Sequence, residues 1–203
     1  MEHTLSEYEN YIEDRINCVI AGDSFVGKTN LLLRFVENEY VNESLQTKGI
    51  DKRLKDITLD GKEYKLDLYD TTGQKKFRSA VDKFFKKSDC VFLVYEITNR
   101  KSFKNISNWI KECKSKASEN VLIVLIGNKC DLNEKRQVTT EEGENLAKKY
   151  KISFYETSAK TGKNVQEAFT EILKNLSSNL RKKSYRLIKQ QEENENEKDR
   201  CCC

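Results

Sequence analysis

Short apolar runs alternate with amphipathic segments along most of the chain. Three of the runs have the length of buried strands, and they lie at about 16–21, 90–95 and 121–126. Three further segments have the spacing of helices, and they cover 101–117, 140–150 and 163–176. This alternation predicts a parallel sheet with helices on both faces, whose carboxyl edge holds the ligand-binding loops.

A hairpin interrupts the alternation in the first half of the chain. The segments 53–59 and 64–69 are joined by Asp60-Gly61, a dipeptide typical of tight turns between antiparallel strands. The hairpin is expected to add one antiparallel strand to an otherwise parallel sheet.

Length and charge limit the possible classes of protein. A chain of 203 residues can bury one sizeable core, and about 165 residues is ordinary for a single domain. Without an apolar stretch of about 18 residues, no membrane-spanning helix is expected. The acidic N-terminus lacks a signal-peptide core. The net charge of +4 is too small to indicate nucleic acid as a partner.

The two ends differ in composition from the domain expected at 15–178. Residues 1–14 are polar and acidic, and 179–203 form a charged tail that cannot build a core, so both are expected to be flexible. The tail is first basic and then acidic: Arg181, Lys182, Lys183, Arg186 and Lys189, then Glu192, Glu193, Glu195, Glu197 and Asp199. The basic part is either a membrane contact or simply the solvated end of the last helix.

Four cysteines lie in or beside apolar elements and lack metal-ligand spacing: Cys18, Cys90, Cys113 and Cys130. We expect them to be reduced packing residues.

The segment 22–29 reads GDSFVGKT and matches the phosphate-loop pattern G-x-x-x-x-G-K-[ST]. Gly22 and Gly27 allow the backbone to curl its N–H groups toward a phosphate chain, and the following helix adds its positive dipole end. Lys28 would neutralise the β- and γ-phosphates, and the Thr29 hydroxyl would bind Mg²⁺. An incidental glycine-rich turn is the alternative, and the position between a strand and a helix argues against it.

A second group of motifs indicates which base is bound. After the run at 121–126, Asp131 can accept two hydrogen bonds from guanine, and adenine has no such pair of donors. Lys129 can lie along the base, Asn128 can brace the loops, and the backbone of Ser158-Ala159-Lys160 can meet guanine O6. An ordinary polar turn is the alternative for each motif alone. Their order after a phosphate loop favours a guanine nucleotide.

The segment between these motifs suggests hydrolysis. Asp70 ends a half-buried strand and can hold Mg²⁺ through a water, while Gly73 lets its N–H reach the γ-phosphate. Gln74 is then placed to orient the attacking water. Thr47 is a candidate second Mg²⁺ ligand because it follows Thr29 by 18 residues, although it could be a solvated loop residue.

These motifs resemble the Ras superfamily over about 15–180, and the Rab branch most closely, through GDSFVGKT, LLLRFVENEY, LDGKEYKLDLYDTTGQKKFRS, VYEITNRKSF, NKCDL and TSAK. The resemblance implies an α/β P-loop NTPase small G domain. Its sheet would be mostly parallel and six-stranded, with one antiparallel strand and helices on both faces.

The resemblance also assigns roles to residues. Gln74 would be catalytic, Mg²⁺ would be held by Thr29, Thr47 and Asp70, and Tyr40 would pack on the guanine edge. The nucleotide-binding set would be Gly22, Ser24, Phe25, Val26, Gly27, Lys28, Thr29, Asn30, Tyr40, Thr47, Gly73, Asn128, Lys129, Asp131, Ser158, Ala159 and Lys160.

The function implied is that of a Rab-like GTPase switch in vesicle trafficking. Its hydrolysis of GTP to GDP would be slow without an activating protein. Its implied partners are exchange factors, GTPase-activating proteins, prenylation, escort and dissociation-inhibitor proteins, and effectors on the switch surface. Two alternatives stay open. Thr72 and Lys75 flank Gln74, which would suit a GTP-binding docking module without hydrolysis. An ATP-using P-loop enzyme would need a lid or phosphoacceptor site that we do not find.

The chain ends in Cys201-Cys202-Cys203, an exposed thiol cluster with no packing value. Arg200 rules out a C-a-a-X box, and one lipid gives only marginal anchoring. By resemblance to Rab proteins, geranylgeranyl groups are expected on Cys202 and Cys203, with Cys201 left open. The protein would cycle between the cytosol and the cytoplasmic face of endomembranes.

The switch segments depart from the Rab pattern. Lys48 and Lys52 occupy positions that are usually apolar and face partners. The usual W-D-T-A-G-Q-E is YDTTGQK at 69–75, and Phe84-Phe85-Lys86-Lys87-Ser88 replaces a usual Tyr-Tyr-Arg-Gly-Ala. These changes leave the nucleotide chemistry in place and the identity of the partners open.

Overall fold

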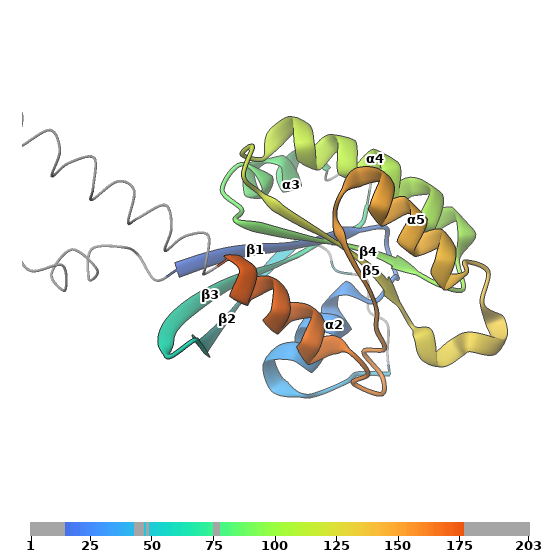
Figure 1. Cartoon of the computed structure of the whole chain (residues 1–203), viewed down its shortest axis with the longest axis horizontal. Helices are drawn as coiled ribbons and strands as arrows, with labels where there is room; N and C mark the ends of the chain where they lie inside the picture. Colours follow the sequence, from blue (N-terminus) through green and yellow to red (C-terminus); the bar gives the residue numbers. More distant parts are fainter. Residues whose placement is uncertain (1–14, 43–46, 48, 75–77, 177–203) are drawn as a thin grey trace, which may run out of the picture.

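A computed structural model describes residues 15–42, 47, 49–74 and 78–176. Its strands form one sheet of order β2-β3-β1-β4-β5-β6 (Figure 1). The strands are β1 (Arg15–Gly22), β2 (Ile50–Leu59), β3 (Lys62–Thr71), β4 (Cys90–Glu96), β5 (Leu122–Asn128) and β6 (Ser153–Glu156). All neighbours are parallel except β2 and β3, which confirms the mostly parallel, six-stranded sheet with one antiparallel strand. The expected flexible ends, 1–14 and 179–203, lie outside the described residues.

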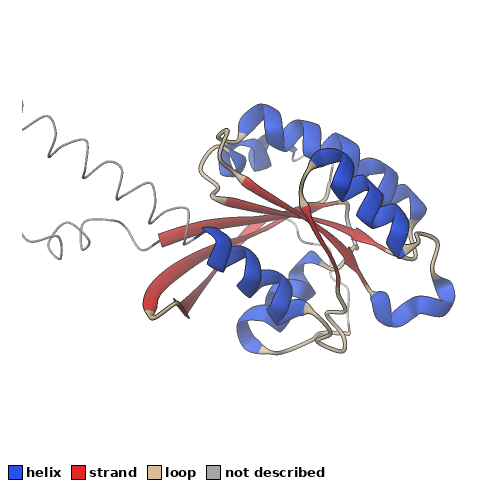
Figure 2. Cartoon of the chain, in the orientation of Figure 1, coloured by secondary structure: helices blue, strands red, loops and turns tan. Residues whose placement is uncertain are grey.

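Helices cover both faces of the sheet, as predicted (Figure 2). They are α2 (Lys28–Glu37), α3 (Arg78–Phe85), α4 (Arg100–Lys116), the short 3₁₀ helix η2 (Cys130–Lys135), α5 (Thr140–Tyr150) and a helical segment at 165–176. The apolar residues of α3, α4 and α5 pack on one face, and those of α2 and of 165–176 pack on the other. The last helix was expected from residue 163, but Asn164 has a left-handed backbone with φ 56° and the helix begins after it.

Two of the helices, α4 and α5, begin where a side chain caps them. Asn99 Oδ1 accepts hydrogen bonds from the backbone N–H groups of Lys101 and Ser102 at the start of α4. At the start of α5, Thr139 and Glu142 form a reciprocal capping box. Both devices satisfy N–H groups that a helix leaves free in its first turn.

Helix α3 was not expected, because its eight residues span barely two turns and give little periodicity.

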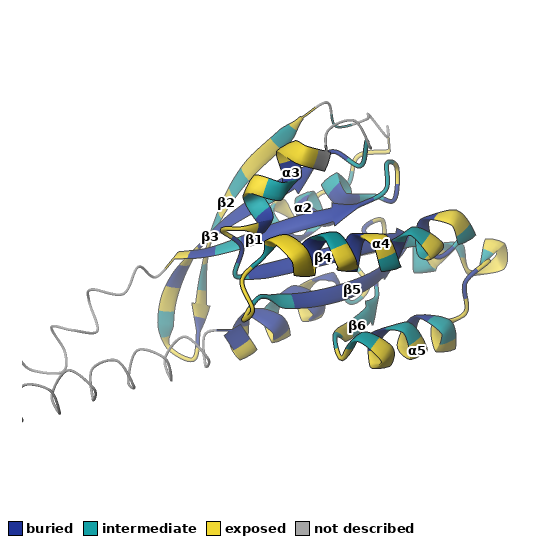
Figure 3. Ribbon diagram, turned by 90° about the horizontal axis from the view of Figure 1, so that it is seen from above, coloured by how far each residue is buried: buried dark blue, intermediate teal, exposed yellow. Residues whose placement is uncertain are grey.

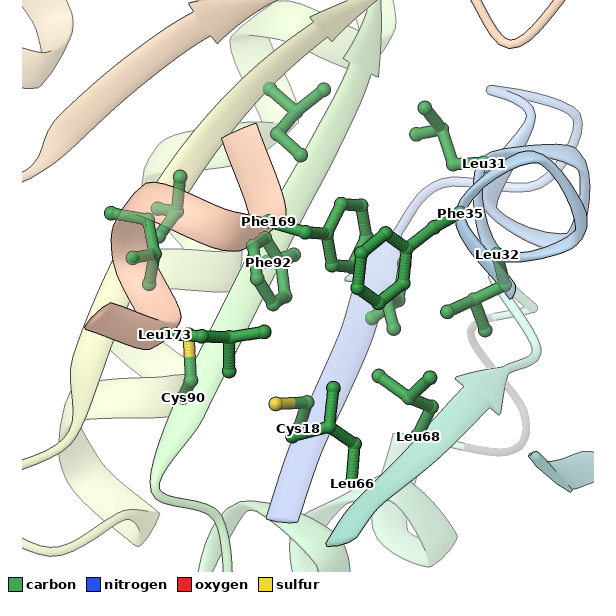
Figure 4. Packing of buried hydrophobic residues seen from close by; sticks show 14 of the residues in the cluster. Cys18, Leu31, Leu32, Phe35, Leu66, Leu68, Cys90, Phe92, Phe169 and Leu173 are labelled. Atoms are coloured by element: carbon green, nitrogen blue, oxygen red, sulfur yellow. The ribbon is translucent and has the colours of Figure 1, made fainter. Parts of the chain in front are cut away.

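Three stacked phenylalanines hold the face formed by α2 and the last helix (Figure 4). The Phe169 ring lies 4.2 Å from that of Phe35 and 4.3 Å from that of Phe92, measured between centroids. Cys18 and Cys90 are fully buried beside them on adjacent strands. This stack joins α2, the central sheet and the helix at 165–176 into one core.

The predicted role of the cysteines is confirmed for three of them. Cys18, Cys90 and Cys113 are reduced and buried, and burial raises the pKa of the Cys113 thiol to about 12. Cys130 is also reduced but only partly buried. No group of three or more metal-ligating side chains occurs among the described residues.

The hairpin turns at Asp60-Gly61, as predicted. Asp60 and Gly61 have φ values of 49° and 79°, and Leu59 pairs with Lys62. Its strands are longer than expected, because β2 already begins at Ile50, which pairs with Thr71. Pairing with β3 therefore extends β2 into a segment whose own pattern is polar.

Burial follows the position of each strand in the sheet (Figure 3). Strands β1 and β4 are buried over most of their length, whereas β2 at the edge exposes much of its surface. In the part of the chain that the structure describes, no helix combines the length and the apolar character needed to cross a bilayer.

Replacing Gly143 of α5 by alanine should destabilise the protein, although glycine-to-alanine changes inside helices ordinarily stabilise by roughly 1 kcal/mol. A Cβ at Gly143 would lie 2.4 Å from Phe154 Cζ and 2.7 Å from Tyr95 Oη. We expect Gly143→Ala to lower the free energy of unfolding, measured in urea, by about 1–3 kcal/mol through overpacking. Asn145→Ala, at an exposed position of the same helix, is the control and should have no such cost. A more stable Gly143→Ala protein would contradict this packing.

Candidate nucleotide site

A cavity of about 410 Å³ lies at the carboxyl edge of the sheet. The predicted residues that line it are Ser24, Phe25, Gly27, Lys28, Thr29, Asn30, Tyr40, Thr47, Gly73, Asn128, Lys129, Asp131, Ala159 and Lys160. They come from the loops after β1, β3 and β6, from the end of β5 and the segment after it, from the start of α2, and from the segment between α2 and β2, which supplies Tyr40 and Thr47. The carboxyl ends of parallel strands thus bring together motifs that are more than 100 residues apart in the chain.

The loop at 22–29 curls around the ammonium group of Lys28. Lys28 Nζ donates to the backbone oxygens of Gly22, at 3.2 Å, and Asp23, at 2.9 Å. Gly27, which caps α2, has a left-handed backbone with φ 92°, and the first turn of α2 contains no acidic residue. The positive end of the helix and its free N–H groups are therefore available to an anion.

Lys28 is buried with too little negative charge around it. Burial lowers the pKa of its ammonium group to about 8, and the charges of Asp70 and Asp23 oppose that effect only partly. A buried cation is costly unless an opposite charge pairs with it. A phosphate in the cavity would supply that charge.

Thr29, Thr47 and Asp70 converge at one point beside Lys28. Thr29 Oγ1 donates to Asp70 Oδ2 at 2.6 Å and lies 3.0 Å from Thr47 Oγ1. The second carboxylate oxygen, Asp70 Oδ1, is buried without a hydrogen-bond partner, and burial raises the pKa of Asp70. Hydroxyl and carboxylate oxygens are the ligands that Mg²⁺ prefers, and a water or ion would satisfy the orphaned oxygen. The donor set fits the expected metal.

The loop after β3 passes directly against the phosphate loop at Gly73. A Cβ on this residue would lie 2.2 Å from Ser24 N and 2.6 Å from Asp23 O, so that only glycine permits the approach. The next residue, Gln74, donates its backbone N–H to Thr72 Oγ1 at 3.3 Å. Its side chain is not among those that line the cavity, so its role in catalysis stays a prediction. Lys75 lies outside the described residues.

The Asn128 side chain connects three loops around the cavity. Its Nδ2 donates to Val26 O in the phosphate loop at 2.9 Å. Its Oδ1 accepts from Ala159 N and from Thr157 Oγ1, each at 3.3 Å. The bracing expected of Asn128 is therefore present.

Lys129 and Asp131 are each held by a neighbour. Lys129 Nζ donates to Phe25 O at 2.9 Å and forms an ion pair with Glu96 Oε2 at 2.8 Å. Asp131 Oδ1 accepts from Ser158 Oγ at 2.7 Å. The ammonium group of Lys129 is tied down at its far end, which leaves its alkyl stem to line the cavity.

Some predicted residues support the cavity without lining it. Gly22 allows β1 to pass close to β4, since a Cβ there would lie 2.2 Å from Val94 O. Val26 is fully buried, and Ser158 stands behind Asp131. Asn30 lines the cavity, but its amide also exchanges two hydrogen bonds with the backbone of Val41, each 3.0 Å long.

The motifs did not predict every residue of the site. Four further residues line the cavity: Leu33, Val41, Asn42 and Leu132. Glu96 and Asp23 contact site residues through their side chain and backbone respectively. Glu96 is the last residue of the buried strand β4, a position that could have suggested it, whereas Asp23 occupies a position that the phosphate-loop pattern leaves unspecified.

Comparison with known proteins places this geometry in context. The profile of the Ras family matches residues 17–178. Ras-related protein Rab-8B of Homo sapiens is 46% identical over 165 residues, which cover 81% of this chain and 80% of the relative. Rab-8 of Diplobatis ommata is 46% identical, with 81% and 79% covered, and Rab-8A of Bos taurus is 45% identical, with 81% and 80% covered.

The depressed pKa of Lys28 makes binding of a phosphate-bearing ligand depend on pH. Above pH 8 the empty site loses the proton of Lys28, and a bound phosphate favours its return, so binding takes up a proton. We expect the affinity for GDP to fall about tenfold between pH 7 and pH 9. Equilibrium titration of a fluorescent GDP analogue measures this change. Lys28→Arg, which stays charged, should lack the dependence. An affinity of the unaltered protein that is constant over this range would contradict the assignment.

Proposed function

The chain belongs to the Ras family, and on this premise we propose that its cavity binds GTP or GDP and hydrolyses bound GTP with the residues described above. The protein is a Rab-like small GTPase of vesicle trafficking. We further propose that residues 15–178 form its G domain, that 1–14 are a flexible extension, and that 179–203 are a hypervariable tail carrying the lipid anchor.

One observation supports nucleotide binding above the others. The phosphate loop meets the loops at 128–131 and 158–160, which are proposed to bind the base, in one cavity, and hydrogen bonds join them. Asn128 donates to the phosphate loop at Val26 O and accepts from the backbone of Ala159. A guanine nucleotide has a base and a phosphate chain that must be held together at a fixed separation. A cavity with both kinds of loop suits such a ligand better than a phosphate ion or a free base.

The proposed contacts divide the nucleotide between two sets of residues. Lys28, Gly73 and the backbone of 24–30 would bind the phosphates, with Ser24 and Phe25 at the outer turn of the loop. Tyr40 would pack on the edge of the guanine. Base recognition would fall to Asn128, Lys129, Asp131, Ser158, Ala159 and Lys160.

Mg²⁺ would be held by Thr29, Thr47 and, through water, by Asp70. The unpartnered Asp70 Oδ1 supports this proposal. When bound, the ion would neutralise charge on the β- and γ-phosphates. Lys28 would stabilise the same charge from the other side, and the buried position of its ammonium group strengthens that interaction.

Hydrolysis is assigned to a water oriented by Gln74. The backbone N–H of Gly73 would donate a hydrogen bond to the γ-phosphate. Loss of that phosphate would release the segment around Gly73. The contact of Gly73 with Asp23 and Ser24 places this segment against the phosphate loop. The reaction is expected to be slow until an activating protein completes the site.

Regulators and effectors are the general partners of this family. We propose exchange factors, activating proteins, escort and dissociation-inhibitor proteins, and effectors that contact the switch surface. On that surface Lys52 forms an ion pair with Asp67 at 2.8 Å, and the rings of Tyr69 and Phe84 lie 4.8 Å apart. A partner would therefore meet a cation beside two aromatic rings.

Attachment to membranes is proposed to depend on two geranylgeranyl groups on Cys202 and Cys203. These residues lie outside the described part of the chain. The start of β1 and the end of the helix at 165–176 lie at the same end of the domain (Figure 1). The proposed nucleotide site is at the opposite, carboxyl edge of the sheet. The protein would then cycle between the cytosol and the cytoplasmic face of endomembranes.

Single-turnover hydrolysis tests the enzymatic part of the proposal. Purified protein loaded with GTP should produce GDP and phosphate, and Gln74→Leu should slow this step at least tenfold while binding of GTP is kept, because the attacking water loses its orienting partner. Competition with ATP should be weak. Equal rates for both proteins would show that Gln74 is not catalytic, and no hydrolysis by either would favour a docking module.

Deleting residues 201–203 tests the anchor. Nucleotide binding should be unchanged, and the protein should move from the membrane fraction to the soluble fraction, since each buried CH₂ of a lipid contributes about 0.8 kcal/mol. Cys202→Ser or Cys203→Ser alone should give partial, reversible association. Mass spectrometry of the C-terminal peptide from cells identifies the modification. An unmodified peptide, with membrane association that survives the deletion, would contradict the proposal.

A further inference from the structure

Asp23 of the phosphate loop is bound by two side chains of α4. Asp23 Oδ2 accepts from Asn105 Nδ2 at 2.5 Å, and Oδ1 accepts from Trp109 Nε1 at 3.0 Å. Asn105 and Trp109 are four residues apart and therefore lie on the same face of the helix. Trp109 is fully buried, and the indole N–H of this side chain has its acceptor in Asp23.

The backbone of the same residue borders the place where phosphate is proposed to bind. Asp23 O accepts from Lys28 Nζ at 2.9 Å. On its other side, a Cβ on Gly73 would lie 2.3 Å from Asp23 C and 2.6 Å from Asp23 O. Asp23 thus touches both the cation of the phosphate loop and the segment that would sense the γ-phosphate.

The side-chain carboxylate and the backbone carbonyl group of Asp23 cannot move independently. Its carboxylate is held by two donors from a single rigid helix, and its carbonyl group is attached to the same Cα. Any rotation of the loop at Asp23 would break a hydrogen bond to α4 or the one to Lys28. The charge of Asp23 also opposes the effect of burial on the pKa of Lys28, as that of Asp70 does more strongly.

We propose that Asp23 is a positioning residue for phosphate binding, and that Asn105 and Trp109 of α4 are the anchor that fixes it. The inference rests on the proposed function, because the ligand concerned is GDP or GTP. It extends the site to a helix that lines no part of the cavity. A movement of α4 would reach the phosphate loop and Gly73 through this carboxylate.

Two asparagines on α4 provide a matched test. Asn105→Ala removes a donor to Asp23, whereas Asn108→Ala changes an exposed residue of the same helix. Release of a fluorescent GDP analogue should be about tenfold faster from Asn105→Ala and from Asp23→Asn, as expected for a lost hydrogen bond to a charged group. Asn108→Ala should release it at the rate of the unaltered protein. The double variant Asp23→Asn/Asn105→Asp, which exchanges donor and acceptor, should recover much of the loss.

A second measurement separates positioning from a general loss of stability. The ratio of GDP affinity to GMP affinity should fall in Asp23→Asn, because the loop acts mainly on the phosphate that GMP lacks. A residue that only stabilised the fold would weaken both nucleotides alike. Trp109 is the only tryptophan in the chain. Its emission should therefore change on release of GDP in the unaltered protein, and the change should be smaller in Asp23→Asn, because an amide oxygen binds the indole N–H more weakly than a carboxylate does.

Release rates within twofold of the unaltered protein for both single variants, or an unchanged ratio of GDP to GMP affinity, would overturn the inference while leaving the proposed function in place. If the unaltered protein does not bind GDP at all, the proposed function fails and this inference fails with it. Should Asp23→Asn not fold, Asn105→Ala decides the question alone, because Asn105 is only half-buried.

Discussion

A buried ammonium group is costly unless dipoles or anions surround it, and the organisation of the site depends on how Lys28 meets this constraint. Two backbone carbonyl groups, of Gly22 and Asp23, accept its hydrogen bonds, which forces the loop after β1 into a tight curl. Asp70 contributes charge from β3 without bonding directly to the ammonium group. The curl in turn requires the close passage of Gly22 past β4 and of Gly73 past the loop. Asp70 and Asp23 compensate the charge of Lys28 only partly, so the cavity would favour a bound phosphate.

The loops that surround the cavity hold one another in place. Asn128 links the phosphate loop to the loop after β6, and Lys129 links it to Glu96 at the end of β4. The loops proposed to bind the base and those proposed to bind the phosphates are therefore joined by the same few side chains. A nucleotide that binds would stabilise several strand ends at once, and its loss would loosen them together, which suits a switch better than a site built from independent parts.

On the surface where effectors are proposed to bind, Lys52 forms an ion pair with Asp67. Burial would raise the pKa of Asp67, but hydrogen bonds from Lys52 and Arg15 outweigh this effect and hold it below its ordinary value. Lys52 thus compensates a buried carboxylate from β2, at the edge of the sheet. An effector that contacted this part of the surface would meet the ammonium group of Lys52.

The sequence by itself determined the class of fold, the parallel sheet, the hairpin turn at Asp60-Gly61 and most of the residues that line the cavity, because each of these depends on a local pattern of apolar spacing, turn residues or loop motif. Tertiary structure alone decided the start of β2 at Ile50, the existence of α3, and the contacts of Glu96 with Lys129 and of Asp23 with α4. Asp23 and Trp109 are 86 residues apart. No local pattern encodes such a pairing, since it exists only after the sheet has brought β1 beside β4 and laid α4 across both of them.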